Sequence, residues 1–307
     1  MITAGKGRLV ALAAVAVGAT VALAGCASGD PLDSGSETAA SGETLVVGSQ
    51  DYYSNEIIAE LYAQALEANG FTVQRDFRIG QREVYIPDIE SGAIDVFPEY
   101  TGNLLQYYVP DTKATTADDV YAELETSLPD GLRVLDQSSA TDQDSYNVTK
   151  EFSEQNGVTS LEDLAKVTTP LTLGGNSELA TRPYGPDGLK SVYGVDVAFT
   201  PIEDSGGPLT IKALEDGDVQ IVNIFSANPA IATSDLVTLD DPKGLFLASN
   251  VVPVVSKKVD DKAAEVINTV SAALTAEELV ALNAKSVDDQ ESAEQIASDW
   301  LAEQKLF

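Results

Sequence analysis

The sequence predicts an α/β protein built from two similar halves, and two observations support this. From residue 44 onward, short apolar runs typical of buried strands alternate with segments in which apolar residues recur at helical spacing. A unit of helix, glycine and strand also occurs twice, over residues 82–97 and 208–225, with Gly92 and Gly217 at the turn. The repeated unit indicates two related halves, and the alternation favours largely parallel sheets.

The elements follow one another from residue 45. A first strand is predicted at 45–47, and a helix over 56–69, which Gly70 closes. Strands are also predicted where other short apolar or alternating runs occur, at residues 71–77, 94–97, 132–135, 146–149, 171–173, 197–200, 219–225, 236–239 and 251–255. The chain ends in helices, where Thr275 and Glu278 have the spacing of a capping box and Trp300 is expected in the core.

The first 26 residues have the pattern of a lipoprotein signal. Lys6 and Arg8 precede an apolar segment over residues 9–23, and Cys26 is the single cysteine of the chain. We therefore expect residues 1–25 to be a signal peptide and residues 26–43 to be a flexible tether that carries lipid on Cys26. A short transmembrane anchor with an incidental cysteine is the alternative. The lipoprotein interpretation places the mature protein outside the cytoplasm, anchored to the cell membrane.

Composition excludes several classes of function. The formal net charge of −31 repels phosphate backbones, which argues against a nucleic-acid partner. The chain has no histidine, so histidine-based acid–base catalysis and imidazole metal sites are excluded. No calcium loop of the Asp-x-Asp-x-Asp-Gly type is found, and no cofactor or metal is expected.

Three polar segments each lie next to a predicted strand, at residues 48–53, 97–103 and 142–146. Ligands of open α/β sheets bind at the carboxyl ends of strands, where helix N-termini also offer free N–H groups. The three segments are therefore candidate ligand-binding loops. Each could instead be an ordinary turn or an exposed acidic loop.

Several segments together resemble the substrate-binding proteins of ABC importers for quaternary amines, the glycine betaine/choline/carnitine-binding family. The matching segments are Val47-Gly48-Ser49-Gln50-Asp51-Tyr52, residues 57–70, Ile94-Asp95-Val96-Phe97-Pro98-Glu99-Tyr100-Thr101-Gly102, Asp204-Ser205-Gly206-Gly207-Pro208, Asp240-Asp241-Pro242-Lys243 and Val252-Pro253-Val254-Val255. The resemblance implies a type II, periplasmic-binding-protein-like fold of two lobes that closes on a ligand between them. Residues 44–143 plus 246–307 would form the first lobe and residues 144–245 the second, with hinges near 142–146 and 246–252.

The resemblance also implies which residues bind the ligand. A methylated ammonium cannot donate hydrogen bonds, so aromatic faces bind it through cation–π attraction. The implied ligand residues are Gln50, Asp51, Tyr100, Asn103, Asp144, Tyr146, Arg182, Phe225 and Asn250. Relatives often have lysine where Gln50 stands and threonine where Asn103 stands, and no aromatic stands near Asn250, where relatives have a tyrosine. Tyr52, Tyr53, Tyr107 or Tyr184 could supply the missing aromatic wall.

The function implied is capture of a quaternary amine, without catalysis, and its delivery to a membrane permease with its ATPase. The protein is expected to act as a monomer. The departures at Gln50 and Asn103 favour a larger or less anionic solute, such as choline or carnitine, or a different polar osmolyte. Two alternatives remain open: a secreted hydrolase that pairs Asp51 with Glu99 or Asp144, and a binding lobe of a sensor or permease regulator.

Overall fold

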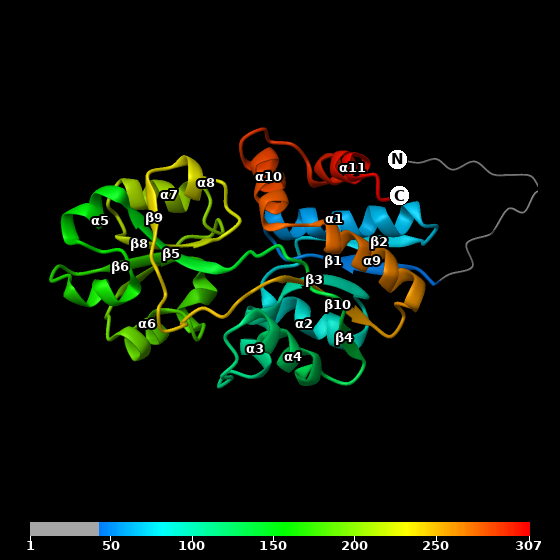
Figure 1. The fold of residues 1–307 in the computed structure, drawn as a ribbon, viewed down its shortest axis with the longest axis horizontal. Helices are drawn as coiled ribbons and strands as arrows, with labels where there is room; N and C mark the ends of the chain where they lie inside the picture. The colour runs from blue at the N-terminus through cyan, green and yellow to red at the C-terminus, as the bar shows by residue number, and fades with distance from the viewer. Residues whose placement is uncertain (1–42) are drawn as a thin grey trace, which may run out of the picture. The chain divides into compact units, whose positions relative to one another are not determined.

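Figure 1 shows a computed structural model of the chain, which describes residues 43–307. The predicted signal peptide, Cys26 and all but the last residue of the predicted tether lie outside the described residues. Within residues 43–307, no helix has the length and apolar character needed to cross a bilayer. The described residues form two lobes, each built around its own five-stranded sheet.

The first lobe has a sheet of order β2-β1-β3-β10-β4 that is covered by helices on both faces (Figure 1). Its strands are β1 (Leu45–Gly48), β2 (Val73–Asp76), β3 (Val96–Tyr100), β4 (Leu132–Val134) and β10 (Val251–Ser256). Its helices are α1 (Tyr53–Ala68), α2 (Arg82–Ser91), α3 (Thr101–Tyr108), α4 (Ala117–Ser127), α9 (Asp261–Ala273), α10 (Ala276–Val287) and α11 (Ala293–Gln304). Strand β10 has its side chains buried on both faces, which explains its unbroken apolar run.

The C-terminal helices complete this lobe as the sequence predicts. Trp300 of α11 is buried in the core that α1, α9, α10 and α11 share. The side chain of Thr275 caps α10 by accepting a hydrogen bond from the backbone N–H of Glu278. The carboxylate of Glu278, however, accepts from the indole N–H of Trp300 at 2.5 Å. The predicted capping box is therefore only half formed, and the Glu278 side chain instead ties α10 to α11.

The second lobe has a sheet of order β7-β6-β8-β5-β9. Its strands are β5 (Asp144–Thr149), β6 (Thr172–Gly175), β7 (Ala198–Pro201), β8 (Ile221–Phe225) and β9 (Leu236–Thr238). Its helices are α5 (Lys150–Asn156), α6 (Pro186–Tyr193), α7 (Pro208–Glu215), α8 (Ala230–Thr233) and the 3₁₀ helices η1 (Leu161–Lys166) and η2 (Ser177–Thr181). Separate apolar cores lie on its two faces, and the larger one contains Tyr146 and Leu173.

The two sheets repeat one topology, as the duplicated sequence unit predicts. In each sheet the unit runs from a helix, through a glycine with positive φ (Gly92 or Gly217), into the central strand β3 or β8. The prediction of largely parallel sheets is only half right. Strand β10 is antiparallel to β3 and β4, and β5 is antiparallel to β8 and β9. The direction differs because β10 and β5 each enter their sheet from the opposite lobe.

Two segments connect the lobes, one leading from β4 to β5 and the other from β9 to β10. They run antiparallel beside each other, with a bridge between Thr141 and Asn250. The backbone N–H of Val251 donates to the carbonyl of Ala140 at 3.0 Å. Both connections therefore pass the same place, next to the carboxyl ends of β3 and β8, where residues of the two lobes meet.

Candidate ligand-binding site

A cavity of about 520 Å³, counted out to its opening on solvent, lies between the two lobes. The lining from the first lobe and the connections consists of Gln50, Tyr52, Gln81, Arg82, Tyr100, Asn103 and Asp142. The lining from the second lobe consists of Asp144, Asn176, Glu178, Leu179, Arg182, Tyr184, Ser205, Asn223 and Phe225. A bound molecule would therefore contact both lobes at once.

Three aromatic side chains meet at one side of the cavity, and we call Tyr52, Tyr100 and Phe225 the aromatic group. The rings of Tyr52 and Tyr100 are stacked with centroids 6.4 Å apart, and the ring of Phe225 lies 5.3 Å from that of Tyr52. Tyr100 and Phe225 are the last residues of β3 and β8, the central strands of the two sheets. The hydroxyl of Tyr100 accepts a hydrogen bond from Nδ2 of Asn55 at 3.3 Å, which helps to fix its ring.

A buried carboxyl group lies beside the aromatic group. Asp142 accepts hydrogen bonds from the hydroxyl of Ser54 at 3.0 Å and from the backbone N–H of Ala227 at 3.1 Å. Burial raises the pKa of Asp142 to about 7. Burial and then the charge of Asp142 raise the pKa of Tyr100. This side of the cavity thus combines aromatic rings with a carboxyl group that ionises near neutral pH.

A polar network joins the lobes on another side of the cavity. The side-chain N–H groups of Asn103 donate to Asp144 at 2.6 Å and to the hydroxyl of Tyr184 at 2.8 Å. The second carboxylate oxygen of Asp144 accepts from Nδ2 of Asn223 at 3.0 Å, and Ser249 donates to Oδ1 of Asn103 at 2.7 Å. Asn103 is therefore fully occupied in holding the two lobes together.

A buried ion pair supports the wall of the cavity in the first lobe. Arg82 donates two hydrogen bonds of 2.9 Å to the carboxylate of Glu99, and neither side chain is more than 7% exposed. Glu99 also accepts from the hydroxyl of Tyr85 at 2.6 Å and from the backbone N–H of Tyr100 at 2.9 Å. Glu99 thus fixes both Arg82 and the main chain of Tyr100.

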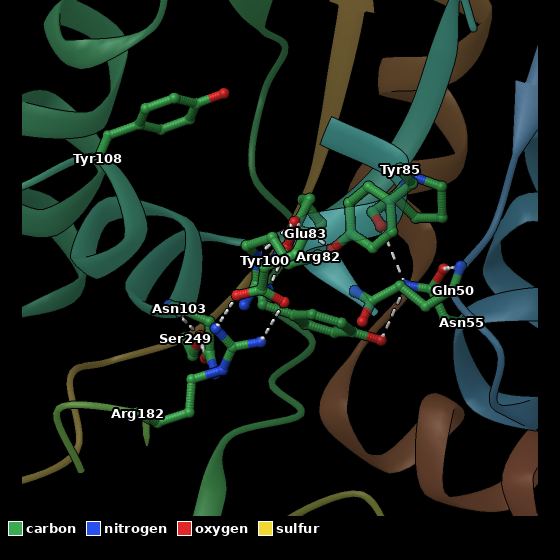
Figure 2. A network of polar contacts seen from close by, with 12 residues as sticks. Gln50, Asn55, Arg82, Glu83, Tyr85, Tyr100, Asn103, Tyr108, Arg182 and Ser249 are labelled. Atoms are coloured by element: carbon green, nitrogen blue, oxygen red, sulfur yellow. Dashed lines mark hydrogen bonds and ion pairs between the residues drawn. The ribbon is translucent and has the colours of Figure 1, made fainter. Parts of the chain in front are cut away.

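A second arginine of the cavity reaches across to the opposite lobe. Arg182 forms a two-pronged ion pair with Glu83 of α2, with N–O distances of 2.5 and 3.1 Å, as Figure 2 shows. The Arg182 side chain is only 11% exposed, whereas that of Glu83 is 54% exposed. The two N–H groups that an arginine would donate to a ligand carboxylate are therefore already bonded to Glu83.

The charges around the cavity favour a cationic ligand. Two arginines and three carboxyl groups line it, and each arginine is already paired with a glutamate that is not part of the lining. The carboxyl groups are those of Asp142, Asp144 and Glu178. Little positive charge is therefore left to compensate an anionic ligand, while negative charge is available to a cation.

The structure brings six of the nine residues implied by the resemblance to the cavity. These are Gln50, Tyr100, Asn103, Asp144, Arg182 and Phe225. Tyr52 and Tyr184, two of the four tyrosines named as substitutes for the missing wall, also line it. Tyr100 and Phe225 end strands β3 and β8, and Gln50 and Tyr52 follow β1, which are the places where ligands of α/β sheets bind.

The other three implied residues do not line the cavity. Asp51 is exposed, and its carboxylate accepts a hydrogen bond from Gln81. Tyr146 is fully buried in the core of the second lobe, where its hydroxyl donates to the carbonyl of Tyr184 at 2.6 Å. The side chain of Asn250 donates to the carbonyl of Ser138 at 2.9 Å and so joins the two connecting segments.

Sequence reasoning missed Arg82, Asn176, Glu178 and Asn223 as lining residues. Arg82 is the first residue of a predicted helix, and Glu178 follows a predicted strand. The position of Glu178 after a strand was a usable signal, because ligands gather at strand ends. Across residues 43–307, no group of acidic or sulfur side chains is arranged to hold a metal ion.

Two α/β lobes joined by two connecting segments, with a cavity between the lobes, give this chain the type II fold of the periplasmic solute-binding proteins. This chain belongs to the family described as the substrate binding domain of ABC-type glycine betaine transport systems, whose sequence profile matches residues 43–303. Members of this family are substrate-binding components of transporters, not enzymes, and work with an ABC permease and its ATPase.

The chain is similar to several named proteins. It is 26% identical to a glycine-betaine-binding protein of Pseudomonas aeruginosa, over 87% of this chain and 90% of that protein. It is 26% identical to the glycine betaine-binding protein YehZ of Escherichia coli, over 83% of this chain and 88% of that protein. A solved structure described as a glycine betaine/carnitine/choline ABC transporter has the same fold, with a TM-score of 0.69 at 18% identity over 85% of this chain and 99% of that one.

Proposed function

We propose that this protein captures a small quaternary ammonium compound outside the cytoplasm and delivers it to an ABC permease. The observation that carries the proposal is the aromatic group beside Asp142 in a cavity between two lobes. Closure of the lobes would bury the ligand, and the closed form would then dock on the permease. No chemical step is part of the proposal, and the relatives named for glycine betaine support it.

The ammonium end of the ligand is assigned to the aromatic group. A methylated ammonium has no N–H group to donate, so it gains most from aromatic faces and from a nearby negative charge. Each aromatic face contributes about 0.5–2 kcal/mol, with the larger values where water is excluded. Tyr52 and Tyr100 lie in the first lobe and Phe225 in the second, so the complete set of faces requires closure.

Calorimetric titration of the purified protein tests this function. Glycine betaine, choline, carnitine, proline betaine and ectoine would be compared with a neutral sugar. Micromolar binding confined to the methylated ammonium compounds is the expected result. Binding of the sugar, or no binding of any quaternary amine, would contradict the proposed substrate class but not the fold.

We also propose that lipid on Cys26 anchors the protein at the outer face of the cell membrane. The motif before Cys26 supports this proposal. Replacing Cys26 with alanine is expected to move the protein from the membrane fraction to the soluble fraction and to abolish incorporation of labelled fatty acid. An unchanged membrane fraction for Cys26→Ala would instead favour a transmembrane anchor.

Affinity for a quaternary ammonium is expected to rise about tenfold between pH 6 and pH 8. Burial raises the pKa of Asp142 to about 7, so this carboxyl group is protonated at the lower pH and ionised at the higher one. A cation beside it favours the ionised form, which couples ligand binding to proton release. Titrations of wild type and of Asp142→Asn across this range measure the effect, and the variant should show a flatter profile.

Asp144 is the neighbouring carboxyl group whose pKa burial also raises. It remains in the Asp142→Asn variant together with Glu178, whose pKa burial likewise raises, so any slope left in that variant reports these two groups. A wild-type affinity that is constant, or that falls with rising pH, would contradict a cation site beside Asp142.

Freeing Arg182 is expected to change charge selectivity. The ion pair with Glu83 occupies the arginine fork, so Glu83→Gln should improve binding of glycine betaine about fivefold relative to choline. Arg182→Ala should weaken the carboxylate ligand and spare choline. Glu125→Gln, which changes an exposed glutamate of α4 outside the cavity, is the matched control. Equal shifts for both ligands would exclude a carboxylate-binding role for Arg182.

A further inference from the structure

Two polar atoms of the cavity wall lack a protein partner. Nε2 of Gln50 and Oε2 of Glu178 are both buried, and neither has a hydrogen-bond partner within residues 43–307. Gln50 belongs to the first lobe and is only 6% exposed, and Glu178 belongs to the second. Buried polar groups are normally hydrogen-bonded, and one left unpaired costs about 1–3 kcal/mol.

The main chain around Gln50 is fixed although its side chain is free. The backbone N–H of Gln50 donates to Oδ1 of Asn55 at 2.8 Å, and its carbonyl accepts from the hydroxyl of Ser49 at 3.0 Å. Figure 2 shows Gln50 beside Asn55 and near the ring of Tyr100. The main chain of Gln50 is thus fixed just after β1, in the wall that also carries the aromatic group.

Glu178 presents its carboxylate oxygen from the first turn of η2. Burial raises the pKa of Glu178, although a backbone hydrogen bond, the charge of Arg182 and a hydrogen bond with the side chain of Asn176 act in the opposite direction. Arg182 stands four residues further on but forms its ion pair with Glu83, and Glu203 accepts from the backbone N–H of Ser177. Whatever the side chain of Asn176 contributes to Glu178, the Oε2 atom itself accepts no hydrogen bond within residues 43–307 and is an open acceptor.

Building on the proposed function, we propose that the ligand carries a hydroxyl or N–H group in addition to its ammonium. This group donates a hydrogen bond to Oε2 of Glu178, and an oxygen of the ligand accepts one from Nε2 of Gln50. The ammonium methyl groups cannot donate to Glu178, so a separate donor is needed. A hydroxyl can both donate and accept. The substrate class is therefore a hydroxylated quaternary amine, in preference to glycine betaine, which offers acceptors only.

A matched pair of ligands tests the proposal on the purified full-length protein. Choline and its O-methyl ether carry the same charge, and they differ in that a methyl group replaces the hydroxyl proton. Wild type is expected to bind choline at least tenfold more tightly, because a hydrogen bond to a carboxylate is among the stronger ones. Glu178→Met removes the acceptor and should bring the two affinities within about threefold of each other.

Two further variants sharpen the test. Glu178→Gln keeps a neutral acceptor and should retain part of the preference for choline. Glu203→Gln changes a nearby glutamate that is not part of the lining, and it should retain the full preference. Equal binding of choline and its ether by wild type would overturn the proposal, as would a preference that survives in Glu178→Met.

Failure of the inference differs from failure of the proposed function. If both ligands bind wild type equally, the result supports a quaternary amine site and contradicts the role of Glu178. If neither ligand binds, the proposed function falls and the inference falls with it. If Glu178→Met does not fold, the comparison of the two ligands on wild type and on Glu178→Gln still decides.

Discussion

Replacing Glu99 with glutamine is expected to lower the free energy of unfolding by about 3–5 kcal/mol. Glu99 is fully buried and accepts four hydrogen bonds, two of them from Arg82. Glutamine would leave the Arg82 charge in the cavity wall without a counter-charge. Its amide N–H₂ would also face donors where the carboxylate now accepts. Removal of one partner from a buried pair is costly because the other partner stays buried and unpaired.

Urea unfolding followed by circular dichroism measures this loss. Glu56→Gln is the matched control, because it makes the same chemical change in the ion pair of Glu56 with Arg78 on the surface. Arg78 is 57% exposed there, so the expected loss is at most about 1 kcal/mol. Losses of similar size in the two variants would mean that the Arg82–Glu99 pair does not stabilise the lobe as its burial implies.

The Pro-Glu-Tyr-Thr-Gly segment illustrates what sequence alone can predict. Its position after a strand and its resemblance to a family motif indicated Tyr100 as a site residue, and Tyr100 does line the cavity. The partner of Glu99 was not predictable from spacing. Arg82 lies 17 residues earlier, and only the packing of α2 against β3 brings the two side chains together.

Tyr146 shows why a residue that sequence assigns to the site can lie two residues too far along a strand. It follows Asp144 by two residues on β5, so both side chains point to the same face of the sheet. Two residues advance a strand by about 6.6 Å, which takes Tyr146 past the cavity and into the core of the second lobe. Tyr184, from the loop before α6, lines the cavity instead. The alternation of residues along a strand predicts which face of the sheet a side chain lies on, but not how far it lies from the cavity.

The direction of strands β5 and β10 was not predicted, for a similar reason. Strands β5 and β10 have the same apolar patterns as the parallel strands around them, so alternation with helices suggested parallel sheets. Their antiparallel pairing comes from the crossing of the chain between lobes. The apolar pattern records burial on each face, which does not depend on the direction of a strand.

Removal of one aromatic face is expected to weaken binding of a quaternary ammonium about 10- to 30-fold, the cost of a desolvated cation–π contact. Tyr100→Leu removes the face at the end of β3, and Tyr100→Phe keeps it while losing the hydroxyl that Asn55 contacts. Choline should therefore bind Tyr100→Phe within about threefold of wild type. Tyr107→Leu, at an exposed tyrosine outside the cavity, should leave the affinity unchanged.

A neutral analogue separates cation–π attraction from packing. 3,3-Dimethyl-1-butanol has the shape of choline with carbon in place of the charged nitrogen. If the aromatic group acts on charge, Tyr100→Leu should weaken choline much more than the analogue, and equal losses would mean that the rings only fill space. Phe225→Leu extends the argument to the second lobe, because the ring of Phe225 packs against that of Tyr52 in the first lobe, with centroids 5.3 Å apart. Its face can act only when the lobes are closed, so Phe225→Leu should chiefly speed ligand release.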